Sequence, residues 1–510
     1  MDEKCMRTPV FNLETVFKDS AEVPVDVDFT MPDYCPEISK ILKCRATARI
    51  SSEDAQARKI TVDGVVTVTV IYADDENNIN SYEYQYPFSK SFDTACDVSD
   101  SFVRTRAKCE YINCRAINER KIDVHGAVGV YVNAMLKKSR EIICDIDDEG
   151  IEVRRSGIPA TMPLGYSSKY VLIEDEIPVG DSQPDVMCLI RYDSAVKLGE
   201  CKLLSGKAII KGELMVNLLY RGEGGLPQSL DTVIPFSQLV EIEGIGEDCD
   251  CEARADVAYL EVKPKFNSSS VSRGFSVDGK IRLTAEAFCQ NDVEVVIDAY
   301  SREYEAQITG DEVYFNKLIC SINDTFSAVK TIDFPSDTIS RVCDASCEVK
   351  NVSTEFEGDC LVVSGTAVCG IMALDNDGAP SYYERPVEYE YRYKLPVSAE
   401  NLIADSQVDV VSVGYTMSGD KKTELRVELS VTASVYSPSK VSLISDVQVN
   451  REKPAKNNNR GALTVYFAES GEQIWDIARK YLADINEVKR INDIKDDNLT
   501  SGQMILVPVK

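Results

Sequence analysis

The most regular pattern in the chain is an alternation of apolar and polar residues, which indicates β-strands with one buried face. It is clearest in three similar segments: KITVDGVVTVTVIY ending at Tyr72, AIIKGELMVNLLY ending at Tyr220 and LVVSGTAVCGIMA ending at Ala373. Each has a glycine near its middle, at Gly64, Gly212 and Gly365, with separations of 212 − 64 = 148 and 365 − 212 = 153 residues. Glycine inside a strand marks a bulge or a close backbone contact, so we predict structural roles for all three.

Other sequence features recur at similar distances from these three glycines. A residue that opens an apolar-periodic stretch stands 28 positions before each glycine, at Pro36, Pro184 and Asp337. A second alternating segment follows each glycine, around Gly126, Gly279 and Glu428. Repeats of this length change the expected fold. We predict a mainly β protein of three sandwich- or barrel-like modules, comprising residues 1–160 with the N-terminal segment, 161–310 and 311–449.

The pattern changes near the C-terminus. Residues 450–461 (NREKPAKNNNRG) are polar and interrupted by proline, so we predict a flexible linker there. In residues 462–510, a strand at Thr464 to Phe467 precedes apolar residues at helical spacing, and a short apolar strand follows them. This order predicts a small α+β (βααβ) domain. Its Trp475, the only tryptophan of the chain, is expected in the core rather than stacked on a sugar.

This last segment resembles the LysM family over its full length. LysM proteins bind N-acetylglucosamine polymers such as peptidoglycan through two loops, and the resemblance implies the following candidate binding residues: Gly471, Glu472, Gln473, Ile474, Asn492, Asp493 and Ile494. The first loop departs from the family's usual Gly-Asp-(Thr/Ser)-Leu, because Glu472, Gln473 and Ile474 replace its last three residues. The departure leaves glycan binding and protein docking as alternatives.

Charge and the N-terminal sequence bear on the location and partners. The net charge is −28, and residues from Arg451 onward contain ten basic and nine acidic residues, so the preceding region carries about −29. Such a body repels nucleic acid and anionic lipid. Residues 1–17 lack the apolar run of a signal peptide, and no stretch approaches the ~18 apolar residues that span a bilayer. We therefore expect a cytoplasmic protein without membrane insertion.

The sequence offers no candidate catalytic residue, metal site or cofactor site. Its 17 cysteines are scattered singly, which indicates reduced thiols that fill the core. Cys249-x-Cys251 and Cys343-x-x-x-Cys347 lack the second pair of a zinc site. The single histidine, His125, stands within a predicted strand, where we expect it to pack. Phosphate-binding and dinucleotide-binding glycine motifs are absent.

Three β-rich repeats followed by one LysM segment resemble the spore-coat morphogenetic proteins of the SipL type, whose repeated unit is the SPOCS domain. The resemblance is strongest in PEISKILK, VDGVVTVTVIY and the LysM segment. It implies a non-enzymatic scaffold that acts in the mother cell at the forespore surface and engages the ATPase of the coat's basement layer. A flexible linker would let the LysM domain search a radius of roughly 20 Å for this partner.

Two other functions remain as alternatives. One is a carbohydrate-binding protein that recognises peptidoglycan through the Glu472 and Asn492 loops. The other is a hydrolase that a LysM domain directs to its substrate, although catalytic motifs are missing.

Overall fold

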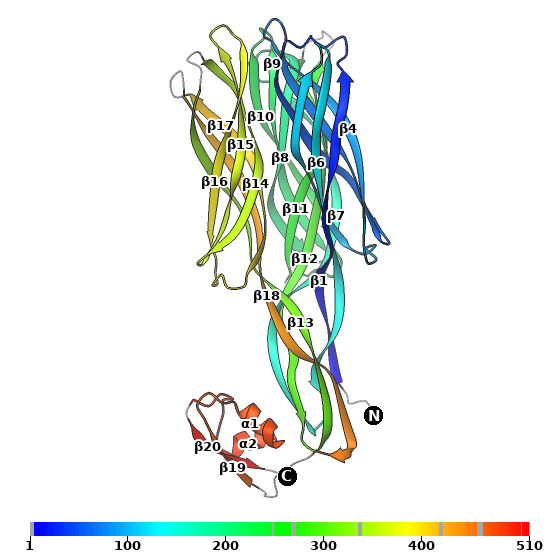
Figure 1. Cartoon of the computed structure of the whole chain (residues 1–510), viewed down its shortest axis with the longest axis vertical. Coiled ribbons are helices and arrows are strands. Elements are labelled where there is room, and N and C mark those ends of the chain that lie inside the picture. The colour runs from blue at the N-terminus through cyan, green and yellow to red at the C-terminus, as the bar shows by residue number, and fades with distance from the viewer. Residues whose placement is uncertain are drawn as a thin grey trace.

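The computed structural model describes residues 5–246, 249–266, 272–334, 339–417, 422–455, 463–500 and 502–508. Long antiparallel strands form a wide body that narrows into a stalk, and the small C-terminal domain lies beside the far end of the stalk (Figure 1). Among the described residues, helices occur only in that C-terminal domain. The mainly β fold with a C-terminal α+β domain is therefore confirmed.

The body and stalk repeat one arrangement of six strands three times. The first module contains β1 (Cys5–Thr30), β2 (Lys40–Gln56), β3 (Lys59–Ala73), β4 (Ile79–Asp93), β5 (Phe102–Ala116) and β6 (Lys121–Ile146). The second contains β7 (Ile151–Pro178), β8 (Val186–Leu204), β9 (Lys207–Gly222), β10 (Pro227–Glu241), β11 (Asp250–Phe266) and β12 (Ser272–Ser301). The third contains β13 (Tyr304–Asp333), β14 (Ile339–Glu357), β15 (Cys360–Asp375), β16 (Pro380–Lys394), β17 (Ile403–Met417) and β18 (Lys422–Pro454).

Within each module, the first strand pairs with the last strand and the last with the fifth, while the three strands between form a second sheet. In the second module the single pair Ser272↔Val186 joins the two sheets at one edge. Alternating apolar residues of both sheets meet in a separate core for each module. The sequence pattern produces this architecture because every second residue of a strand faces the opposite sheet.

The central glycines allow an aromatic ring of the neighbouring strand to lie against the backbone. A Cβ atom at Gly64 would overlap the ring of Phe88, and one at Gly212 would overlap the ring of Phe236. In the third module a Cβ atom at Gly365 would overlap Tyr389. The predicted close-contact role of these glycines is confirmed.

The three modules form a closed ring around an approximate threefold axis. β4 lies against β8, β10 against β14 and β16 against β2, so the outer strand of each three-stranded sheet contacts the next module. Residues at the repeat offsets of 148 and 153 meet in one buried cluster on the axis, namely Ile71, Leu219 and Met372. The fold of one chain thus has the arrangement of a trimer.

The stalk consists of three two-stranded ribbons, β1 with β6, β7 with β12 and β13 with β18. Equivalent residues of the ribbons, Ile142, Val295 and Leu443, are buried in a common stalk core. The expected module limits at residues 160 and 310 fall within strands β7 and β13 of the stalk.

The first part of the predicted linker continues strand β18 instead of leaving the sheet. Asn450 pairs with Glu305 and Pro454 with Tyr304. The long β13 supplies hydrogen-bonding partners for this polar segment, which the apolar pattern alone could not reveal. Linker residues 456–461 lie outside the described part of the chain.

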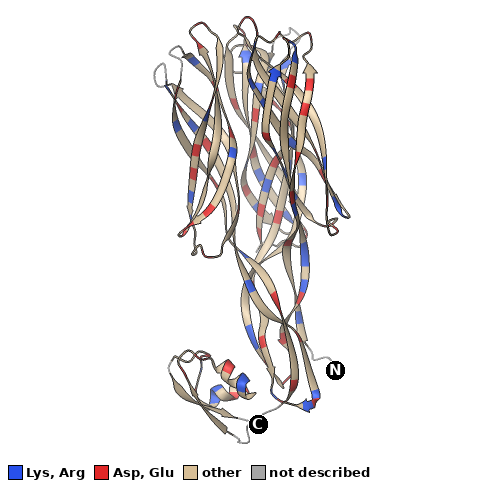
Figure 2. Cartoon of the chain, viewed as in Figure 1, with Lys and Arg blue, Asp and Glu red and all other residues tan. Residues whose placement is uncertain are grey.

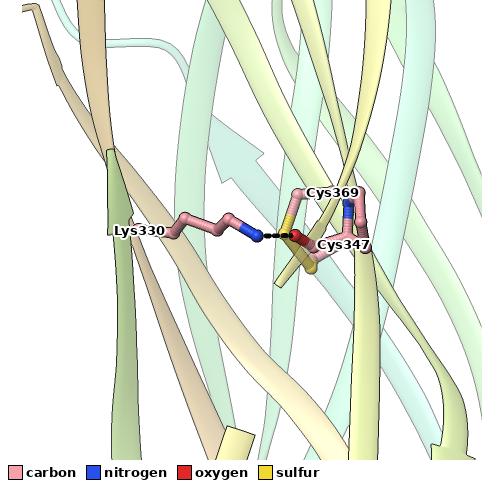
Figure 3. Close-up of a disulfide and its surroundings, with 4 residues drawn as sticks. Lys330, Cys347 and Cys369 are labelled. Carbon is pink, nitrogen blue, oxygen red and sulfur yellow. Dashed lines mark hydrogen bonds between the residues drawn. A yellow bond between two sulfur atoms is a disulfide. The ribbon is translucent and has the colours of Figure 1, made fainter. Parts of the chain in front are cut away.

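Two expectations about single residues were wrong. His125 is exposed, because Val124 and Gly126 occupy the buried positions of β6, and its imidazole contacts the Asp26 carboxylate. Cys347 and Cys369 form a disulfide instead of remaining thiols (Figure 3). The pairing of β14 with β15 places these cysteines opposite each other, with Cα atoms 4.1 Å apart. Nearby, Lys330 Nζ donates to the Pro386 carbonyl at 2.7 Å, the hydrogen bond drawn in Figure 3.

Candidate functional site

The C-terminal domain has the predicted order of elements: β19 (Leu463–Ala468), α1 (Ile474–Tyr481), α2 (Ile485–Ile491) and β20 (Gln503–Pro508). β19 and β20 form an antiparallel pair, and the helices cover one of its faces. The core contains the residues at helical spacing that the sequence indicated, including Ile474, Ile477, Ala478 and Val488. Asp484 begins α2 with a side-chain oxygen that accepts the Glu487 N–H.

Backbone hydrogen bonds join the first predicted binding loop to the segment between α2 and β20, the segment that begins with the second predicted loop. The Gly471 N–H donates to the Leu499 carbonyl at 2.7 Å, and the Leu499 N–H donates to the Glu472 carbonyl at 3.0 Å. The Ile474 N–H donates to the Asp497 carbonyl at 2.8 Å. The first loop therefore lies beside residues 497–499, which follow the second predicted loop in the same segment.

The first loop is fixed by its own side chains. Gly471 has φ +93°, which favours glycine, and Glu472 accepts the Glu469 N–H and the Tyr466 hydroxyl, both at 2.8 Å. These bonds, chiefly the one from the Glu469 backbone, lower the pKa of Glu472. Gln473 is half-buried and precedes α1, whereas Ile474 is 0% exposed and belongs to the core. Ile474 therefore cannot contact a ligand at the surface.

In the second loop, the Asn492 amide is used within the domain. Its Nδ2 donates to the Leu506 carbonyl and its Oδ1 accepts the Leu506 N–H, both at 2.7 Å, so it attaches the end of α2 to β20. Asp493 is exposed with φ +53°, and Ile494 is partly buried against the core. Of the seven predicted residues, Ile474 alone is buried; Gly471 and Asp493 are exposed, and Glu472, Gln473, Asn492 and Ile494 are partly exposed.

The stalk contacts the domain through α1, a feature that the sequence did not indicate. Trp475 is 2% exposed and packs edge-on against Tyr300 at the end of β12, with ring centroids 5.1 Å apart. Its Nε1 donates to Asp298 Oδ2 at 2.7 Å, and Arg479 donates to the same oxygen at 2.6 Å. The core position predicted for Trp475 is confirmed, and the stalk completes that core.

A second group of bonds holds the turn between the helices. The Tyr300 hydroxyl donates to the Ala483 carbonyl and Arg302 Nη1 donates to Asp484 Oδ2, both at 2.7 Å. Burial raises the pKa of Tyr300, so its hydroxyl remains a donor at neutral pH. Arg302 also contacts Glu152, whose pKa is raised by burial. The domain is therefore docked, which contradicts the hypothesis that it searches freely on a linker.

The described residues place the two loops and the stalk contact on different parts of the domain. The hydrogen bonds from the stalk reach Trp475, Arg479, Ala483 and Asp484, all on α1 or just after it. None of the described hydrogen bonds joins the stalk to the loops. The arrangement presents the loops at a fixed orientation.

The side chains at the surface of the two loops offer groups for hydrogen bonding and surface contact. Within the described part of the chain, no group of three or more His, Cys, Asp or Glu side chains is arranged to hold a metal ion. In the same residues, no helix has the length and apolar character needed to cross a bilayer. Basic and acidic residues are interspersed along the strands of the body and stalk (Figure 2).

Repeated β modules joined to a small βααβ domain define a class of multidomain proteins, and the comparisons identify the domains. The family described as SipL, SPOCS domain, matches residues 37–117 and 185–265, and the LysM domain matches residues 469–508. The chain therefore carries two matched SPOCS domains and a LysM domain, which confirms the resemblance to SipL-type proteins and indicates a sporulation-related role. No curated protein and no solved structure matches the chain.

The SPOCS matches cover strands β2 to β5 and β8 to β11, the part of each module between its two stalk strands. Strands β14 to β17 occupy the same place in the third module. Both matched families are families of binding domains without catalytic activity.

Proposed function

We propose that this protein is a non-enzymatic scaffold in spore-coat assembly, which recruits the ATPase of the coat's basement layer to the forespore surface in the mother-cell cytoplasm. The observation that carries the proposal is the docked LysM domain. Contacts of Asp298, Tyr300 and Arg302 hold it at the end of a stalk whose other end is a body of three modules. A scaffold needs two such binding parts at a fixed separation.

The docked LysM domain favours recruitment of a partner for a different reason than a domain on a flexible linker would. A docked domain loses little orientational freedom when its partner binds. The entropic cost of binding is therefore smaller, and the same contacts give a higher affinity. The half-buried Gln473 and the exposed Asp493 lie outside the stalk contact and remain available to the partner.

The test is a pull-down from a lysate of sporulating cells with the full chain and with a chain lacking residues 463–510. We expect the full chain to capture the ATPase and the shortened chain to lose it, while circular dichroism of the shortened chain retains the β signal. Equal capture by both chains would exclude the LysM domain as the recruiting part. A double substitution, Gln473→Ala with Asp493→Ala, tests the loops without removing the domain.

Peptidoglycan binding is the second candidate function, and the adjacency of the two loops favours it. The hydrogen bonds between Gly471, Glu472 and Leu499 hold the first loop against the segment that carries the second loop, and LysM domains offer two such loops to sugar chains. Sedimentation with purified peptidoglycan distinguishes the two functions. Retention that the loop substitutions abolish, without capture of the ATPase, would replace the scaffold proposal with glycan recognition.

A further inference from the structure

Two cysteines of the first module meet at the seam between its sheets. Cys44 lies on β2 and Cys114 on β5, strands of different sheets that pack against each other. Both thiols line the same groove, and each shifts the pKa of the other. Cys44 is buried, whereas Cys114 is partly exposed. The chain thus brings two nucleophilic groups, distant in sequence, to the lining of one groove.

The pair lines a groove between the first and third modules. The groove has a volume of about 350 Å³, several times the ~30 Å³ that one water molecule occupies in the liquid. Lys43 and Tyr382 also line it, and the Lys43 ammonium pairs with the Glu384 carboxylate there. A small molecule can therefore reach the sulfur atoms beside a positive charge.

The two thiols differ in acidity. The Cys44 thiol donates to the Cys114 sulfur, and this hydrogen bond lowers the pKa of Cys114 and raises that of Cys44. The Lys43 charge acts in the same direction on Cys114. By contrast, burial raises the pKa of Cys109, on the same strand β5, to about 11. Because the thiolate is the nucleophile, Cys114 is the reactive member of the group.

We propose that Cys44 and Cys114 form a redox-active dithiol that reacts with low-molecular-weight disulfides and closes into a disulfide between the two sheets of the first module. The Cys114 thiolate attacks one sulfur of the disulfide R–S–S–R, forms a mixed disulfide and releases one thiolate. Cys44 then loses its proton to solvent and attacks the Cys114 sulfur, which releases the second thiolate. Two cysteine thiols are oxidised and one R–S–S–R is reduced to two R–SH.

The seam of the second module carries a cysteine pair at a different position. Cys201 on β8 and Cys251 on β11 lie on the corresponding strands, and each shifts the pKa of the other, but the repeat offset of 148 places Tyr192 where the first module has Cys44. In the third module, the hydroxyl groups of Thr354 on β14 and Ser406 on β17 form a hydrogen bond. The hydroxyl pair cannot be oxidised in this way.

The experiment is incubation of the full chain with oxidised glutathione, followed by peptide mapping by mass spectrometry without reduction. We expect a linked pair of peptides that contains Cys44 and Cys114, lighter by two hydrogen atoms than the separate peptides. In Cys44→Ser, the second step is blocked, so we expect glutathione to remain attached to Cys114. Cys109→Ser is the matched control and should form the Cys44–Cys114 link as the unaltered chain does.

A separate measurement on the unaltered chain tests the nucleophile. Iodoacetamide at neutral pH should modify Cys114 at least tenfold faster than Cys109. Equal rates, stable glutathione on Cys114 in the unaltered chain, or links between other cysteines in place of Cys44–Cys114 would each overturn the proposal.

Discussion

Asp298 is the residue on which the position of the C-terminal domain depends most directly. One of its oxygens accepts hydrogen bonds from Trp475 and Arg479, and its side chain is 22% exposed. A hydrogen bond to a charged group contributes about 1.5–3 kcal/mol. Since Trp475 is the only tryptophan, its fluorescence reports on this contact alone.

We predict that Asp298→Ala separates the domain from the stalk. Without the carboxylate, the Trp475 indole loses its acceptor and becomes exposed to water. The emission maximum should shift to longer wavelength, and limited proteolysis should release the C-terminal domain faster. Asp292→Ala, at an exposed position of the same strand, is the control and should leave both measurements unchanged. An unshifted spectrum in Asp298→Ala would mean that Tyr300 and Arg302 suffice for docking.

Individual side chains of the candidate site were predictable only where local pattern determines them. The burial of Trp475 was expected of a large aromatic residue in a small domain, but its partner Asp298 stands 177 residues away, and no periodicity connects them. Likewise, the burial of Ile474 follows from the helix that it begins, whereas family resemblance placed it in a binding loop. Contacts between elements far apart in the chain, such as a stalk strand and a C-terminal helix, produce no recognisable pattern in a single sequence.

Among the elements, the three ribbons of the stalk determine how far the LysM domain stands from the body. Their core is made of small clusters, in which Leu443 is 3% exposed and contacts equivalent residues of the other ribbons. Two-stranded ribbons are only marginally stable alone, so the stalk depends on this shared core. Alternation revealed the strands but not their length, because it does not show where pairing with another strand ends.

We predict that Leu443→Ala destabilises the chain by about 2–5 kcal/mol, through lost apolar burial and the cavity left behind. Denaturant unfolding followed by circular dichroism measures the change. Trp475 fluorescence should lose its native value at a lower denaturant concentration than the β signal of the body, because the docking contact lies on the stalk. Ser442→Ala, at the neighbouring exposed position, should change the stability by less than about 0.5 kcal/mol. A similarly small effect of Leu443→Ala would show that the ribbons do not depend on their common core.

At the scale of the whole molecule, the modules are joined near the axis by buried ions as well as by apolar residues. Arg191 of the second module contacts both oxygens of Asp344 in the third at 2.8 Å, and the side chains are 3% and 5% exposed. Burial lowers the pKa of Arg191, while the charge of Asp344 opposes that change. Three repeats were visible in the sequence, but the ring was not, because the offsets do not show which modules touch.

We predict that Arg191→Met costs about 3–5 kcal/mol, since it leaves the Asp344 carboxylate buried without its cation. Adding Asp344→Leu should restore most of the loss. Thermal unfolding by calorimetry measures both variants. Arg115→Met is the control, because Arg115 and Asp123 form an ion pair with side chains 79% and 38% exposed, and exposed pairs contribute at most about 1 kcal/mol. Equal losses of stability in the two Arg→Met variants would mean that burial of the Arg191–Asp344 pair does not increase its contribution to stability.

The docking face of the stalk occurs once although the stalk is built from three equivalent ribbons. Asp298 has aspartates at the corresponding positions of the other ribbons, Asp145 and Asp446. The positions that correspond to Tyr300 hold Asp147 and Gln448, and those that correspond to Arg302 hold Glu149 and Asn450, so the complete set of contacts occurs only on β12 and the turn after it. Sequence differences between the three ribbons therefore leave one docking site on a nearly symmetric stalk. One C-terminal domain binds there, and its rotational position about the long axis of the molecule is fixed.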